Sequence, residues 1–153
     1  MTEKDQYIEQ VGLFYEKYGL PKMAGRILGY LIASSTENNS FDDLMNALQA
    51  SKGSISGNLK LLANQKMIEK HMVTGIRQSY YRIATNSLNN MITSKVTSIG
   101  LFKDIIAKGI ALNDNDESLV KNELKSIHSY YEFLENEIPK LRLKWEQLNA
   151  NNE

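Results

Sequence analysis

The order of elements predicted for residues 50–83 restricts the fold of this chain more than any other feature. An amphipathic helix that starts among small residues is followed by two short strand-like segments around a glycine turn. Together with the helix predicted just before it, this is the order of a winged helix-turn-helix, which is a DNA-binding arrangement. Residues 51–82 also hold six Lys and Arg against one acid, whereas the whole chain has 18 of each sign. A local excess of positive charge in a neutral protein predicts a site for a polyanion.

The helix that begins after Ser51 is predicted to have an inner and an exposed side. Ile55, Leu59 and Leu62 recur at helical spacing and are expected to face the core. The opposite side includes two glycines, although a glycine in an exposed helix costs roughly 1 kcal/mol relative to alanine. Close approach of a DNA groove to the helix backbone explains this composition, and neutral drift on a solvated helix is the alternative. This predicted DNA-facing side holds Gly53, Gly57, Lys60 and Asn64, and it is flanked by Ser54 and Ser56.

Residues 67–73 and 78–83 are predicted to pair as a β-hairpin around the turn 74–77. Gly75 suits the positive φ that a tight turn requires. Arg77 lies at the predicted tip, where it can enter a minor groove or pair with a phosphate, or remain an ordinary solvated arginine. Because a hairpin directly after this helix occupies the position of a wing, DNA contact is the favoured interpretation.

Three further helices are predicted before residue 50. The first ends at Gly19, which suits a helix C-cap. Gly25 and Gly29 lie four residues apart in the second helix, so a neighbouring backbone can approach closely. Residues 34–40 are predicted to form a polar loop, and Ser40 is expected to cap the third helix.

Two long helices are predicted after residue 85, and the second carries a heptad seam. Its apolar residues recur in alternating steps of four and three from Val120 to Leu148. A lone helix cannot bury such a seam, so it packs on the helix predicted at 88–110, on a second copy of the chain, or on both. The predicted dimerisation residues are Leu124, Ile127, Tyr131, Leu134, Ile138, Leu141 and Trp145.

Two interruptions are predicted in this region. Residues 113–115 should separate the two long helices, with Asp116 as a cap for the second. Pro139 lies inside the seam, and a proline removes one backbone hydrogen bond of a helix. A kink or a fresh helix start is therefore expected near residues 137–139.

Composition disfavours several functional classes. The chain has no cysteine, which excludes disulfides and thiolate chemistry and fits a cytoplasmic location. No apolar run approaches the roughly 18 residues of a membrane span, and the polar N-terminus does not resemble a signal peptide. His71 and His128 lack a metal-ligand partner at helical spacing, and no phosphate-binding loop or dinucleotide-binding glycine motif occurs. We therefore predict no catalysis, no metal site and no cofactor.

Three segments resemble the GbsR-type branch of the MarR-like bacterial transcriptional regulators: GLPKMAGRILGYLI (19–32), SKGSISGNLKLL (51–62) and TGIRQSYYRI (74–83). The resemblance extends over residues 5–85, beyond which only the helical architecture is similar. It implies a mainly α winged helix-turn-helix fold with a small β-hairpin wing and long C-terminal dimerisation helices. It also implies a homodimeric repressor or regulator, often one that responds to a small-molecule effector. The sequence identifies no effector-binding residues.

The resemblance assigns further residues by position. Lys52 and Asn58 join the recognition helix. Lys22 and Arg26 occupy the basic helix start of the family, where they either touch the DNA backbone or tie their helix to its neighbours. The complete predicted DNA-binding set is Lys22, Arg26, Ser51, Lys52, Gly53, Ser54, Ser56, Gly57, Asn58, Lys60, Gly75, Arg77 and Gln78.

The predicted domains are a winged helix-turn-helix DNA-binding domain at 1–85 and a helical dimerisation region at 86–153. The predicted function is sequence-specific binding of double-stranded DNA by a homodimeric transcriptional regulator. The alternative is a winged-helix protein–protein interaction module without sequence-specific DNA binding. Such a module would not need the five net positive charges of residues 51–82. RNA binding is a third possibility, but the aromatic platforms of single-strand readers are missing.

Overall fold

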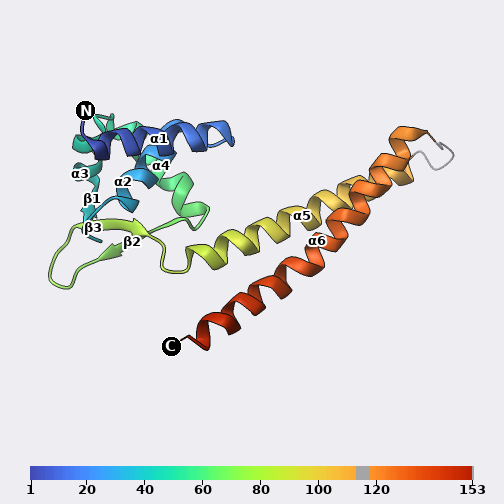
Figure 1. The fold of residues 1–153 in the computed structure, drawn as a ribbon. Helices are drawn as coiled ribbons and strands as arrows, with labels where there is room; N and C mark the ends of the chain where they lie inside the picture. The colour runs from blue at the N-terminus through green and yellow to red at the C-terminus, as the bar shows by residue number, and fades with distance from the viewer. Residues whose placement is uncertain (113–117, 153) are drawn as a thin grey trace. The chain divides into compact units, whose positions relative to one another are not determined.

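The computed structural model describes residues 1–112 and 118–152, which form two compact units, Met1–Asn90 and Met91–Glu153. The elements are helices with a small antiparallel sheet (Figure 1), so the predicted mainly α fold with a small wing is confirmed. No helix in the described ranges is long and apolar enough to cross a membrane. In chain order the elements are α1 (Glu3–Lys17), α2 (Lys22–Ile32), β1 (Asn39–Ser40), α3 (Phe41–Leu48), α4 (Lys52–Asn64), β2 (Ile68–Met72), β3 (Ser79–Ile83), α5 (Ser87–Ala111) and α6 (Leu119–Ala150).

Helices α1 and α2 pack closely against each other in the first unit. Gly19 ends α1 with φ +88°, and the N–H groups of Gly19 and Leu20 donate back to the last turn, as expected for a glycine cap. A Cβ added to Gly25 would lie 2.8 Å from the Cα of Gly12 and 2.8 Å from the carbonyl oxygen of Val11. The predicted close approach of a neighbouring backbone at Gly25 is therefore confirmed.

Serine caps begin both helices of the helix-turn-helix. The Ser40 hydroxyl accepts a hydrogen bond from the Asp43 N–H at 3.1 Å, and Asp43 Oδ2 accepts from the Ser40 N–H at 2.9 Å. The Asp43 carboxylate also accepts from the Ser40 hydroxyl at 2.7 Å, and this bond is the main cause of the lowered pKa of the Asp43 carboxyl, followed by the bond from the Ser40 N–H. Ser51 caps α4 by accepting from the Ser54 N–H at 3.2 Å. The inner side of α4 is buried as predicted, because Ile55, Leu59 and Leu62 are at most 4% exposed.

The sheet has the order β1-β3-β2 and is antiparallel throughout. Strands β2 and β3 form the predicted hairpin, with Glu69 opposite Arg82 and His71 opposite Tyr80. Strand β1 pairs Asn39 with Tyr81, so the prediction of a polar loop over 34–40 is wrong at its last two residues. A two-residue strand leaves no periodic pattern in the sequence, because it forms only through pairing with a segment some forty residues away.

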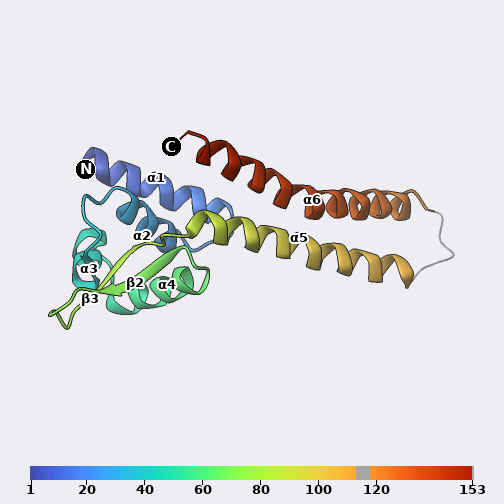
Figure 2. The ribbon, with the colours of Figure 1, turned by 90° about the horizontal axis from the view of Figure 1, so that it is seen from below.

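The second unit contains α6 and the part of α5 that follows residue 90. The rings of Phe102 on α5 and Tyr131 on α6 lie 5.2 Å apart in an edge-to-face arrangement. Lys103 Nζ pairs with Glu135 Oε2 at 2.5 Å, and the same carboxylate occupies the space that a side chain at position 100 would fill. Figure 2 shows α5 and α6 running side by side along these contacts.

Helix α6 continues through Pro139, so the predicted fresh start near 137–139 is wrong. The proline removes one backbone hydrogen bond, and α6 is nevertheless continuous over its 32 residues. A kink stays a prediction.

The predicted break at residues 113–115 and the predicted cap Asp116 lie outside the described residues. Ser118 caps α6 by accepting from the Lys121 N–H at 3.2 Å.

Candidate nucleic-acid interface

The side of α4 opposite the core is open to solvent. Ser51, Lys52, Gly53, Ser56, Gly57 and Lys60 are exposed, and Ser54 and Asn58 are half-buried. A Cβ added at Gly53 or Gly57 would meet no atom within 4 Å. Packing among the described residues therefore gives no reason for glycine at either position. Six of the eight predicted contact residues on α4 and its cap form one exposed face, with two half-buried residues beside it.

The side chains of this face differ in whether they already form hydrogen bonds or ion pairs within the chain. The Asn58 amide donates to the Ser54 carbonyl oxygen at 2.8 Å, and the Ser51 hydroxyl serves the helix cap. Lys52, Ser56 and Lys60 make no hydrogen bond or ion pair with the described parts of the chain. These three side chains are therefore free to bind another molecule without breaking an internal contact.

The hairpin tip is also exposed. Gly75 has φ +83°, which a glycine adopts without strain, so the predicted turn chemistry is confirmed. Arg77 and Gln78 are exposed, and Arg77 has no ion-pair partner within the ranges that the structure describes. The tip thus presents one unpaired guanidinium to solvent.

Lys22 and Arg26 are tied to α1. The Glu9 carboxylate forms an ion pair with each of them. Lys22 Nζ lies 3.0 Å from Glu9 Oε2, and Arg26 Nε lies 2.5 Å from Glu9 Oε1. The hydrogen bond from Lys22 is the main cause of the lowered pKa of Glu9. Of the two roles that the sequence left open, the structure provides the tie between neighbouring helices.

Arg82 also forms ion pairs within the chain, although a count of charges in the sequence includes it among the available cations. Its guanidinium donates to Glu69 and to Glu37, each at 2.7 Å, and these bonds raise its pKa. The cations of residues 51–82 that lack a carboxylate partner among the described residues are Lys52, Lys60, Lys66, Lys70 and Arg77.

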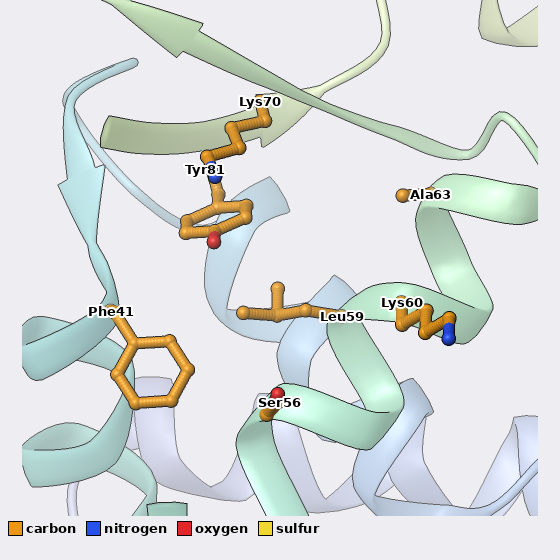
Figure 3. A pocket seen from close by; sticks show the side chains of 7 residues that line it. All are labelled: Phe41, Ser56, Leu59, Lys60, Ala63, Lys70 and Tyr81. Carbon is orange, nitrogen blue, oxygen red and sulfur yellow. The ribbon is translucent and has the colours of Figure 1, made fainter.

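A pocket of about 250 Å³ lies between α4 and the sheet (Figure 3). Figure 3 shows Lys70 and Tyr81 on the sheet side, opposite Leu59 and Ser56 of α4. Lys70 therefore lines the same pocket as the predicted DNA-binding residues Ser56 and Lys60. Sequence reasoning missed this, although the alternation of β2 places Lys70 on the face of the buried Ile68. The remaining lining residues are Phe41 and Ala63.

The described residues contain no cluster of three or more His, Asp or Glu side chains placed to hold a metal ion. The described residues are instead suited to contact with a polyanion. They present the exposed face of α4 and five cations without a carboxylate partner, one of which is the arginine at the hairpin tip.

The chain is similar to known regulators over most of its length. A family model described as "MmpR5-like MarR family transcriptional regulator" matches residues 86–148. The HTH-type transcriptional regulator MmpR5 of Mycobacterium tuberculosis is 31% identical over 130 residues, which are 83% of this chain and 79% of that protein. A crystal structure of a transcriptional regulator has a TM-score of 0.81 at 25% identity, covering 95% of this chain and 99% of the other.

These relatives confirm the resemblance to MarR-like regulators, but they do not confirm the GbsR-type branch. The chain belongs to the MmpR5-like MarR family of transcriptional regulators, and it is a DNA-binding regulator of transcription.

Proposed function

We propose that the protein is a homodimeric repressor that binds a near-palindromic DNA site in a sequence-specific manner. The observation that supports this most is the exposed face of α4, where two glycines have no packing role within the described part of the chain and Lys52, Ser56 and Lys60 have no partner there. In this proposal residues 1–85 read DNA and residues 86–153 hold the dimer together. The similarity of residues 51–62 and 74–83 to GbsR-type regulators supports a place near that branch.

The proposed division of work on DNA follows from side-chain chemistry. The hydroxyls of Ser54 and Ser56 contact base edges in the major groove, and Gly53 and Gly57 let the helix backbone come close. Lys52 and Lys60 pair with phosphates, which adds affinity without sequence preference. At the flank, Arg77 and Gln78 of the wing enter the minor groove, as Gly75 keeps the tip narrow. The half-buried Asn58 contributes its free carbonyl oxygen.

The C-terminal part of α6 supports dimerisation. Leu124, Ile127, Tyr131, Leu134 and Ile138 of the seam are partly buried. Further along, Leu141 is 63% exposed, Trp145 is 52% exposed and Leu148 is 57% exposed. Large apolar side chains that recur on one helix and stay in water indicate an interface. We propose that a second copy covers them, so that a two-fold axis places the two α4 helices roughly 34 Å apart on successive major grooves.

A small-molecule effector is the proposed means of regulation. A ligand that binds one arrangement of the dimer better than the other shifts the population of DNA-competent dimers. Its effect on DNA binding would come from changing the spacing or tilt of the two α4 helices.

The experiment that tests the proposal is fluorescence anisotropy with DNA from upstream of the protein's own gene, over a series of salt concentrations, against a scrambled duplex. Salt-sensitive binding with a clear preference for the native sequence is expected. The variant Lys60→Ala should weaken binding to both duplexes and make the salt slope shallower by about two, one for each copy in the dimer, whereas Lys144→Ala on α6 should change neither. Absence of binding even at low salt would contradict the proposal and favour the protein-interaction module.

A further inference from the structure

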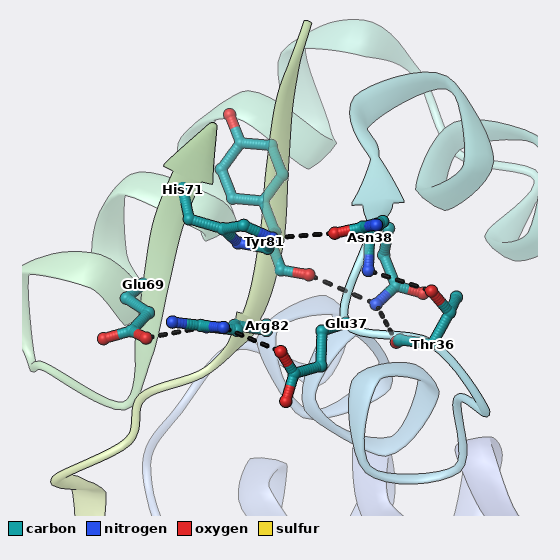
Figure 4. A network of polar contacts seen from close by, with 8 residues as sticks. Thr36, Glu37, Asn38, Glu69, His71, Tyr81 and Arg82 are labelled. Carbon is teal, nitrogen blue, oxygen red and sulfur yellow. Dashed lines mark hydrogen bonds and ion pairs between the residues drawn. The ribbon is translucent and has the colours of Figure 1, made fainter. Parts of the chain in front are cut away.

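A polar network connects the wing to the loop that precedes α3. We call it the wing clamp and define it by Glu37, Asn38, Glu69, His71 and Arg82 (Figure 4). Arg82 bridges two carboxylates, because Nε donates to Glu69 Oε1 and Nη1 donates to Glu37 Oε2, each at 2.7 Å. His71 Nε2 lies 2.9 Å from Asn38 Oδ1. Two side chains of the loop are thus held by two strands that follow about thirty to forty-five residues later.

The wing clamp lies on the face of the sheet that turns away from the core. Ile68 is buried, and Tyr81 and Ile83 pack against the core, so alternation along the strands places Glu69, Arg82 and their neighbours on the opposite face. The clamp residues are therefore not required to fill the hydrophobic core.

The buried side chain of Asn39 adds further hydrogen bonds between the loop before α3 and strand β3. It is 2% exposed, and its amide donates to the Tyr81 carbonyl oxygen at 3.2 Å and to the Thr36 carbonyl oxygen at 2.9 Å. The next residue, Ser40, pairs with Tyr80 and also caps α3. The loop, β1 and the first turn of α3 thus form one continuous path from the wing strands to the helix-turn-helix.

We propose that the wing clamp is a positioning device for DNA binding, and that Glu37 and Arg82 set the angle between the wing and α4. A two-stranded hairpin is marginally stable by itself, and the one strand that the described residues add to it, β1, has two residues. Its orientation therefore depends on side-chain contacts across the loop. The proposal rests on the wing contact with DNA proposed above.

The exposure of Glu37 separates this role from a role in folding. Its side chain is 74% exposed, and ion pairs with such partners contribute little to folding stability. A carboxylate beside a DNA-binding segment also repels phosphates. Simple electrostatics therefore predicts that removing the charge of Glu37 strengthens DNA binding, whereas the clamp predicts that it weakens binding. The two explanations differ in sign.

The test compares Glu37→Gln, Arg82→Gln and the double variant by anisotropy with the same duplex. If loss of the clamp leaves about half of the molecules with a correctly placed wing, the apparent Kd rises about twofold. Each single variant should show this loss, and the double variant should be no weaker than Arg82→Gln alone, because Arg82→Gln already removes the link to Glu37. The salt slope should stay unchanged, since Arg82 is not a phosphate contact.

A matched control and a second measurement complete the test. Glu16→Gln removes the same charge from an exposed site of the same unit that has no ion pair in the described ranges, and it should bind as tightly as the unaltered protein. In the free protein, amide hydrogen exchange at residues 73–78 should be faster in Glu37→Gln, without loss of the folded state. Binding by Glu37→Gln that is as tight as, or tighter than, that of the unaltered protein would overturn the proposal, as would unchanged exchange. Arg77→Ala, measured in parallel, tests the wing contact itself, so a failure of that contact is distinguished from a failure of the clamp.

Discussion

Gly57 offers the clearest test of why α4 carries glycine on its exposed face. An alanine side chain at this position would point into open space, because no atom lies within 4 Å of the added Cβ. The backbone of α4 is an ordinary helix there. In the isolated protein the substitution Gly57→Ala therefore costs no packing energy and removes the conformational freedom that glycine has in the unfolded chain.

The expected effects on stability and on DNA binding have opposite signs. Alanine is favoured over glycine by about 1 kcal/mol in an exposed helix interior, so Gly57→Ala should raise the free energy of unfolding by about that amount. If the DNA approaches the helix backbone closely, the added methyl group overpacks the interface. Overpacking costs about 1–3 kcal/mol, which corresponds to a Kd at least about fivefold higher.

Urea unfolding and anisotropy on the same preparations measure the two effects. Gly109→Ala on α5 is the matched control, because its added Cβ also meets nothing within 4 Å, and it should gain stability without losing DNA affinity. A stabilised Gly57→Ala that binds the operator as tightly as the unaltered protein would refute the reasoning. Neutral drift would then be the better explanation of the glycines on α4.

Three further substitutions test other parts of the structure. Gly25→Ala should destabilise the first unit by about 1–2 kcal/mol in urea unfolding, because backbone atoms of α1 lie 2.8 Å from the added Cβ and cannot move aside as a flexible side chain would; an unchanged midpoint would contradict the close packing. Leu141→Asp should leave the fold intact but shift sedimentation toward monomer, since this side chain is 63% exposed in one chain; an unaltered dimer would exclude it from the interface. Asp43→Asn should remove part of the acid sensitivity of unfolding. The folded-state pKa of Asp43 lies below its unfolded value, so its stabilisation is complete above about pH 4 and is lost as the pH falls through the folded pKa; parallel stability curves of the two proteins below pH 4 would count against the cap.

Local chemistry made the helix-turn-helix and wing tip predictable. A serine cap, a glycine with positive φ and a three-residue apolar stripe each depend on neighbours within a few residues, so Ser51, Gly75 and the inner side of α4 could be located from the sequence. The spacing of Gly25 and Gly29 likewise predicted a close contact between helices, although it could not show that α1 is the partner.

Long-range pairing was beyond the reach of the sequence. Arg82 counts as one positive charge in any composition, and only the fold brings Glu37 within 2.7 Å of it. The roles of Lys22 and Arg26 were undecided for the same reason, because Glu9 reaches them only after α1 packs on α2. Of the kink or fresh helix start predicted near Pro139, the fresh start does not occur, because the loss of one backbone hydrogen bond does not end a helix whose other turns are intact.

The internal ion pairs also limit how steeply the DNA affinity of this protein can fall as the salt concentration rises. Within residues 51–82, five cations lack a carboxylate partner among the described residues, so a proposed dimer offers twice that number. Full use of all of them as phosphate contacts gives a slope of log K against log salt of about −9, because each contact contributes about −0.9 on B-form DNA. Lys22, Arg26 and Arg82 add nothing while they remain paired with Glu9, Glu37 and Glu69. Anisotropy over a salt series measures this slope directly. A slope steeper than about −9 would mean that the ion pairs of Arg82 open on binding or that cations outside residues 51–82, Lys22 and Arg26 included, contact DNA. Arg82→Gln would make the slope shallower only if the ion pairs of Arg82 open.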